Sequence, residues 1–260
     1  MAGLDSLVHE QINPTSTRRR FFFPILASVL LLIAFVGFSR TFYLRALVDT
    51  SGFITAQKLS GQVVIHGVIF SSWILLFLAQ SWLATSKKVH LHRKLGIAGT
   101  VLAAAVFLSG LLVTLNWLDR LAATNVLPAD TTVMAGISGI VLHNFISMLS
   151  FAAFVMLAVY WRRNGADHKR LMFFASVSML GPALSGGDRP IGELLVQFVP
   201  RPDAAVILSL IGVLVAYDLL VDRRLRKVTI WGGAAVATKY VLLPILTTNE
   251  SVQAAVIWLA

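Results

Sequence analysis

The sequence of 260 residues contains no cysteine and has few charged side chains. The absence of cysteine excludes disulfide bonds, iron–sulfur ligation by thiolates, covalent haem attachment and thiolate catalysis. Charged residues make up 13% of the chain, whereas about a quarter of an ordinary soluble domain is charged. Because 57% of the residues are hydrophobic, the chain cannot cover its surface for water, which predicts an integral membrane protein.

The N-terminus also lacks the features of a cleavable signal peptide. Residues 1–20 are polar and end in three arginines. The apolar run that follows, from Phe21 to about Phe42, is longer than the ~7–15 residues of a signal h-region and has no small-residue cleavage site. We therefore expect a cytoplasmic tail over 1–20 and a single integral membrane domain over 21–260.

Apolar segments of spanning length recur along this domain. A transmembrane helix needs about 20 mostly apolar residues, and the pattern predicts an all-α membrane protein with about seven such helices. The expected spans are 21–43, 62–84, 95–116, 137–160, 170–185, 204–221 and 228–247. The fifth is short and contains Gly181-Pro182, which predicts a kink or an early end, and residues 190–199 suit an amphipathic surface helix.

The net charge of +10 follows the expected loops. Fifteen Lys and Arg lie in the N-terminus and in the turns at 84–94, 161–170 and 222–228. Six lie in the alternate loops and Lys239 lies within the seventh span, which accounts for all 22. This bias places the N-terminus in the cytoplasm and the C-terminus outside. Membrane topology therefore explains the charge, and we expect the lipid bilayer, not nucleic acid, as the partner.

A histidine-bearing unit occurs twice. His66 and His92 are 26 residues apart, His143 and His168 are 25 apart, and the copies are offset by 77 and 76 positions. Such self-similarity predicts one shared core. We expect a four-helix core of the second to fifth helices, built from copies at about 62–116 and 137–185, with the sixth and seventh helices at 204–247.

The histidines pair between the copies. A separation of 26 residues is about 39 Å along a helix, so the two members of one copy cannot share a metal ion. Residues at matched depths can, which predicts His66 with His143 near the outer face and His92 with His168 near the inner face. Facing imidazoles are common haem ligands. Four neighbouring cations are candidates for binding haem propionates: Arg93, Lys94, Lys169 and Arg170.

Simpler explanations of these residues stay open. Glycines near the histidines also suit plain helix–helix contacts, and basic clusters mark cytoplasmic helix ends in many membrane proteins. His92 and His168 lie at the expected interface, where a histidine is also compatible with solvation or capping.

The motifs His92-Arg93-Lys94-Leu95-Gly96 and His168-Lys169-Arg170-Leu171-Met172 resemble paired motifs of a large group of uncharacterised bacterial multi-pass membrane proteins. Some small relatives of that group are associated with cytochrome oxidase assembly. The four-histidine plan is also similar to that of the ascorbate-type transmembrane dihaem cytochromes b. That resemblance implies one haem between His66 and His143 and another between His92 and His168, although histidines of those cytochromes generally lie deeper in the membrane.

The sequence therefore predicts a haem b-binding electron-transfer protein of the bacterial inner membrane, with one or two haems. It would be a component of a membrane oxidoreductase, with a quinone or a redox protein as partner. Two alternatives stay open. One is a haem- or copper-handling protein of respiratory assembly, and the other is a membrane scaffold or transporter without a cofactor.

Overall fold

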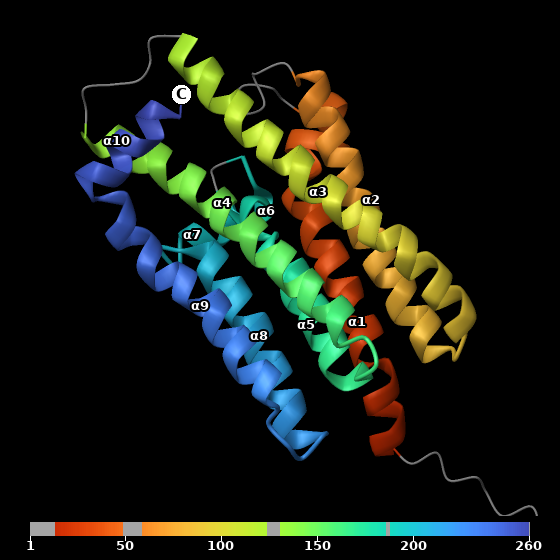
Figure 1. Ribbon diagram of the computed structural model, residues 1–260. Coiled ribbons are helices and arrows are strands. Elements are labelled where there is room, and N and C mark those ends of the chain that lie inside the picture. Colours follow the sequence, from red (N-terminus) through yellow and green to blue (C-terminus); the bar gives the residue numbers. More distant parts are fainter. Residues whose placement is uncertain (1–13, 49–58, 124–130, 186–187, 260) are drawn as a thin grey trace, which may run out of the picture.

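The protein is a bundle of helices (Figure 1). A computed structural model describes residues 14–48, 59–123, 131–185 and 188–259, and each regular element within these ranges is helical. Residues 1–13 of the expected N-terminal tail lie outside the described ranges. The elements are α1 (Pro14–Gly37), η1 (Ser39–Tyr43), η2 (Arg45–Leu47), α2 (Gly61–Thr85), α3 (Val89–Ala123), α4 (Thr131–Tyr160), α5 (Gly165–Ser178), α6 (Gly181–Leu184), α7 (Pro190–Val196), α8 (Pro202–Leu220), α9 (Lys227–Thr247) and α10 (Glu250–Trp258).

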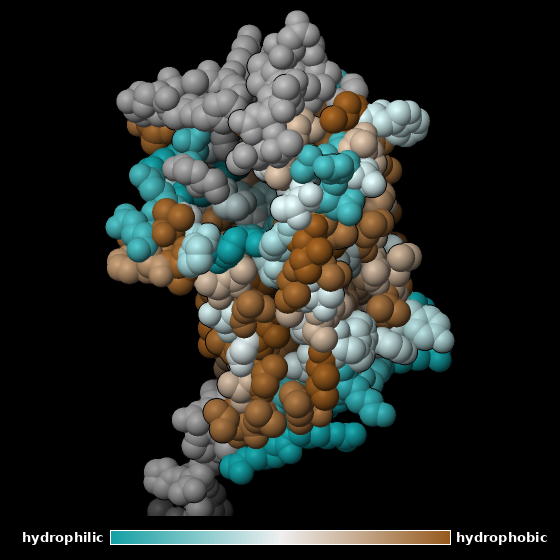
Figure 2. Space-filling view, turned by 90° about the vertical axis from the view of Figure 1, so that its left-hand side faces the viewer, coloured by the Kyte–Doolittle hydropathy of each residue, from teal (hydrophilic) through white to brown (hydrophobic). Residues whose placement is uncertain are grey.

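Six of these helices are long and apolar enough to cross a membrane, namely α1, α2, α3, α4, α8 and α9. Their outer faces carry large apolar side chains, such as Ile97 and Val101 on α3, which are 74% and 71% exposed. Figure 2 shows apolar side chains over the middle of the visible face and hydrophilic ones at its lower end. An exposed apolar surface of this extent marks contact with lipid or protein, and with six helices of spanning length it supports the predicted membrane class.

The fifth predicted span, 170–185, is not among the six. The structure divides this segment into α5, which has 14 residues and is about 21 Å long, and the single turn α6. Pro182 explains the break. A proline cannot donate to the carbonyl four positions earlier and its ring clashes there, and that position is Ser178, the last residue of α5. The expected surface helix at 190–199 corresponds to the shorter helix α7.

The basic segments of the chain gather at one end of the bundle. The start of α1 and the turns α2–α3, α4–α5 and α8–α9 all lie at the lower end of Figure 1, which we call the basic end. The α2–α3 turn closes with the backbone of Lys87 in the left-handed region, at φ 59°, and the Lys88 N–H donates to the Leu83 carbonyl. This is the usual way to satisfy the last carbonyls of a helix, although glycine more often fills the left-handed position.

The two copies of the predicted repeat form two helical hairpins, α2–α3 and α4–α5. The hairpins are unequal, since α3 has 35 residues and α5 has 14. Moreover, α5 packs against α1 and α9 as well as against α2 and α4. The core therefore extends beyond the second to fifth helices, and the repeat itself stays a prediction.

Short helix α5 lies at the centre of the apolar core. Its side chains from Arg170 to Ser178 are buried, apart from Met172, which is half-buried. Phe173 and Phe174 are fully buried, and Phe174 stacks on Phe154 of α4 with 5.5 Å between ring centroids. Burial of a large apolar side chain contributes about 1.5–3 kcal/mol. The core thus holds a helix that is too short to span a membrane by itself.

The junction of α1 with α6 depends on a glycine. A Cβ at Gly37 would collide with the Ala183 carbonyl oxygen and lie 2.7 Å from the Ala183 Cβ. We expect Gly37→Ala to destabilise the protein by about 1–3 kcal/mol through overpacking, measured as a lower thermal midpoint in detergent. Gly212→Ala in α8 is the matched control, because nothing lies within 4 Å of the new methyl group. An equal loss in both variants would contradict this account.

Candidate functional site

Two of the predicted histidines meet at the basic end of the bundle. His92 lies in the first turn of α3 and His168 in the first turn of α5. Their ring centroids are 6.3 Å apart and the ring planes cross at 85°. One metal ion shared by two imidazoles requires ring centres about 6 Å apart, because a metal–imidazole bond is ~2.0–2.1 Å long. The separation of the rings therefore suits one shared metal ion.

Backbone carbonyls hold both rings in one tautomer. The His92 Nδ1 donates to the carbonyl of Gln80 in α2 at 3.3 Å, and the His168 Nδ1 donates to the carbonyl of Ala158 in α4 at 2.8 Å. A carbonyl only accepts, so Nδ1 carries the proton and Nε2 keeps its lone pair. No hydrogen bond to either Nε2 occurs in the described part of the chain. This arrangement is typical of metal-ligating histidines.

The local sequence explains how the two rings are placed. The Gln80 side-chain amide also donates to the His92 backbone carbonyl at 3.1 Å. Gln80 of α2 therefore holds both the backbone and the ring of His92. On α5, the Asn164 side chain caps the helix by accepting from the Asp167 N–H. Burial lowers the pKa of His168 and outweighs the opposite effect of its hydrogen bond to the Ala158 carbonyl, which favours the neutral imidazole that a metal ion binds.

A large cleft adjoins the two rings. It has a volume of about 1960 Å³, about twice the upper end of the ~300–1,000 Å³ that is typical of small-molecule pockets. Its walls come from α1 to α5 and include His92 and His168, the aromatic rings of Phe23, Trp73 and Phe77, and a strip of α3 with Gly96 and Gly99. Glycine has no side chain to keep a flat ligand away from that helix. The cleft thus has the size and walls for a large planar ligand.

Cations surround the cleft, but not the set that the sequence predicted. Arg93 and Lys169 line it, whereas Lys94 and Arg170 do not. Four further cations line it: Arg20, Lys87, Arg162 and Arg163. These four belong to the basic segments whose charge was attributed to membrane topology alone. Their proximity to the histidines depends on how the hairpins pack.

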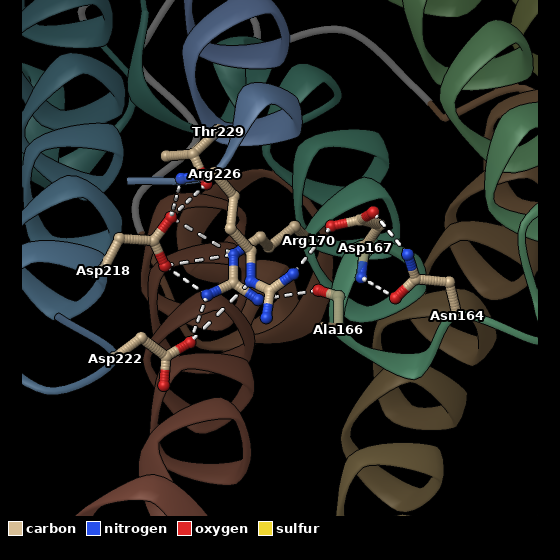
Figure 3. A network of polar contacts seen from close by, with 8 residues as sticks. All are labelled: Asn164, Ala166, Asp167, Arg170, Asp218, Asp222, Arg226 and Thr229. Carbon is tan, nitrogen blue, oxygen red and sulfur yellow. Dashed lines mark hydrogen bonds and ion pairs between the residues drawn. The ribbon is translucent and has the colours of Figure 1, made fainter. Parts of the chain in front are cut away.

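Arg170 has a structural role in place of the predicted cofactor contact. Its side chain is fully buried and forms an ion pair with the equally buried Asp218 of α8 and a second with Asp222 at 2.8 Å. The Asp218 carboxylate also accepts from the Thr229 hydroxyl at 2.5 Å and from the Arg226 N–H. Figure 3 shows this network joining α5 to the α8–α9 hairpin. It holds α5, and with it His168, in place.

The structure does not bring the predicted outer histidines together. His66 bonds through Nδ1 to the Ser109 hydroxyl at 2.9 Å and stacks on Phe70. His143 faces elsewhere: its ring lies against Gly181, 6.2 Å from the ring centroid of Tyr240. His66 lines a second cavity of about 240 Å³, and His143 does not. The outer pairing therefore finds no support in the positions of the rings.

The inner site combines several features that a haem group would need. Two imidazoles with free Nε2 atoms, a cleft with aromatic and glycine walls, and a cationic rim match the needs of a macrocycle with two axial ligands and anionic propionates.

Fold and site together define an all-helical membrane protein with six helices of spanning length and a histidine pair in a basic cleft. Comparisons of the chain with protein-family models, with curated proteins and with solved structures found no match. The functional proposal therefore rests on the geometry of the site.

Proposed function

We propose that the protein binds haem b in the inner cleft and transfers electrons within the bacterial inner membrane, with the basic end facing the cytoplasm. The observation that carries the proposal is the pairing of His92 with His168 at 6.3 Å between ring centroids. A bound haem would supply one-electron redox chemistry.

Each part of the site has a role in this proposal. His92 and His168 would ligate the iron through Nε2, while the Gln80 and Ala158 carbonyls keep Nδ1 protonated and orient the rings. Arg93 and Lys169 are the predicted cations that line the cleft, and they would pair with the propionates. The aromatic side chains of the cleft would shield the bound group from water, and the fully buried Arg170–Asp218 pair fixes the helix that carries His168.

The position of the cleft also suits electron exchange with a partner at the surface. It lies at the end of the bundle where three basic turns meet, so an acidic redox protein would be attracted there. The cations that line the cleft would then pair with the propionates and also attract the acidic partner protein. Because membrane topology alone also predicts a basic end, the histidine pair and not the charge favours the electron-transfer function over a cofactor-free scaffold.

The first test is the visible spectrum of the purified protein. We expect stoichiometric, non-covalently bound haem with a Soret band that shifts on reduction by dithionite. Pyridine haemochrome analysis would identify haem b and give the ratio of haem to protein. Substoichiometric haem or bound copper would favour a role in respiratory assembly. A colourless preparation that takes up no added haemin would contradict the proposal.

A further inference from the structure

The second cavity lies nearer to the opposite end of α2 from the basic turn, and the proposed haem site makes no use of it. This outer cavity has a volume of about 240 Å³ and is walled by η1, α2, α3 and α4 and by Met179, Pro182 and Arg189. A cavity of about 150 Å³ is large enough to bind benzene. The outer cavity can therefore hold a substituted six-membered ring.

Three helices of spanning length, α2, α3 and α4, wall the outer cavity in part, which suits a lipid-soluble ligand. The outer cavity is separate from the inner cleft and shares no lining residue with it. Phe70 of α2 lines the outer cavity and Trp73, three residues later, lines the inner cleft. Trp73 makes an edge contact with the fully buried Phe151, 4.9 Å between ring centroids. A thin aromatic layer thus divides the two spaces.

His66 offers a hydrogen-bond acceptor to the outer cavity. The Ser109 oxygen lies 3.2 Å from the Val106 carbonyl oxygen and 2.9 Å from the His66 Nδ1. We assign the single Ser109 proton to the carbonyl, so that the hydroxyl accepts from the His66 Nδ1 and Nε2 keeps its lone pair. In that tautomer, Nε2 accepts a hydrogen bond from a hydroxyl group but repels a carbonyl oxygen.

Two donors come from other elements. Among the residues that the structure describes, the buried Arg189 Nε has no hydrogen-bond partner, while its Nη1 donates to Thr41. Ser147 of α4 accepts from the buried Lys239 Nζ at 3.0 Å, which leaves the hydroxyl proton of Ser147 free to donate. Arg189 and Ser147 both line the outer cavity. A buried donor without a partner is costly, so Arg189 favours a ligand with oxygen atoms.

We propose that the outer cavity binds the ring of a lipid-soluble quinol. One ring hydroxyl donates to the His66 Nε2, and the ring oxygens accept from Arg189 and Ser147, while the apolar tail passes to the lipid. The choice of a quinol over another flat ring with hydroxyl groups rests on the proposed electron-transfer function. The tautomer of His66 makes the reduced form the preferred ligand.

The test measures binding of tritiated decylubiquinol, kept reduced under argon, to the purified protein in nanodiscs, with empty nanodiscs as the blank for partition into lipid. We expect saturable binding to the wild type that n-decanol does not displace, and weaker binding of decylubiquinone. His66→Phe keeps a flat ring over Phe70 but removes the acceptor, so we expect quinol affinity to fall about tenfold or more, the equivalent of one hydrogen bond.

A glycine pair supplies the steric test. A Cβ at Gly110 would lie 2.9 Å from the Met148 sulfur and 3.4 Å from the His66 Cε1, so that Gly110→Val fills the outer cavity and should abolish binding. Gly212→Val in α8, where nothing lies within 4 Å of a Cβ, should leave binding unchanged. Binding at the blank level in the wild type, displacement by n-decanol, or undiminished affinity in Gly110→Val or His66→Phe would each overturn the proposal.

Haem content is measured on the same samples, which separates this proposal from the proposed function. A haem-loaded protein that binds no quinol overturns only the quinol site. Saturable quinol binding by a colourless protein overturns only the haem site. Gly110→Val is expected to keep its haem, because Gly110 does not line the inner cleft.

Discussion

Replacing either His92 or His168 with alanine is expected to reduce bound haem to background. Each imidazole would be one of two ligands in the proposed site, where the ring centroids lie 6.3 Å apart. The measurement is the Soret absorbance per mole of purified protein, with circular dichroism to show that the helices remain folded. The two variants should behave alike, because both rings contribute equally to the site.

His90→Ala is the matched control, since His90 is exposed on the same first turn of α3 and does not line the cleft. The double variant His66→Ala with His143→Ala should also keep the haem, because those rings face different neighbours. Haem retained in a folded His92→Ala variant would contradict the inner site. Haem lost only in the outer double variant would show that the outer pair is the true ligand set.

Breaking the buried ion pair of Arg170 is expected to cause the largest loss of stability. Removal of one partner from a buried pair costs about 3–5 kcal/mol, and the partly exposed Asp222 would compensate the charge of Arg170 only in part. Asp218 and Arg170 are both 0% exposed, and α5 is joined to the α8–α9 hairpin through them. We expect Asp218→Leu to lower the thermal midpoint by roughly 10 °C in a chain of this size.

The double variant Arg170→Met with Asp218→Leu tests the cause of that loss. If an unpaired buried charge destabilises Asp218→Leu, removal of both charges should recover part of the midpoint. Arg40→Ala is the control, because the Arg40–Glu193 pair is about half-exposed and an exposed pair contributes about 1 kcal/mol or less. A double variant as unstable as Asp218→Leu would show that the hydrogen bonds of Asp218 to Thr229 and Arg226, not the charge, determine the loss.

The sequence predicted most of the helices because hydrophobic length is a local property. The predicted span at 62–84 corresponds to α2 at 61–85, and that at 228–247 to α9 at 227–247. The third span was predicted to begin at residue 95, six residues too late, because α3 begins at Val89 in a basic stretch. Helix ends with polar side chains are invisible to a criterion based on apolar runs.

The fifth predicted span is not of spanning length, but the early end predicted from Gly181-Pro182 is confirmed, because α5 ends at Ser178. A run of apolar residues at 170–185 is compatible with a spanning helix or with a short helix buried on all sides. Pro182 decided the outcome locally by ending α5 at Ser178, and the surrounding helices supply the burial. The sequence also predicted that Arg170 contacts a cofactor. Its ion-pair partners Asp218 and Asp222 lie about 50 positions further along the chain, so the local pattern did not reveal them.

The sequence by itself determined the membrane class, most of the helices, the matched spacing of the histidines and the basic turns. Only the tertiary structure decided which histidines approach each other, which cations line the cleft and which one is neutralised in the core. The physical reason is that composition and spacing act along one helix, whereas the rotation of each helix about its axis is set by packing against the others. His92 and His168 face each other, and His66 and His143 do not, because of that rotation.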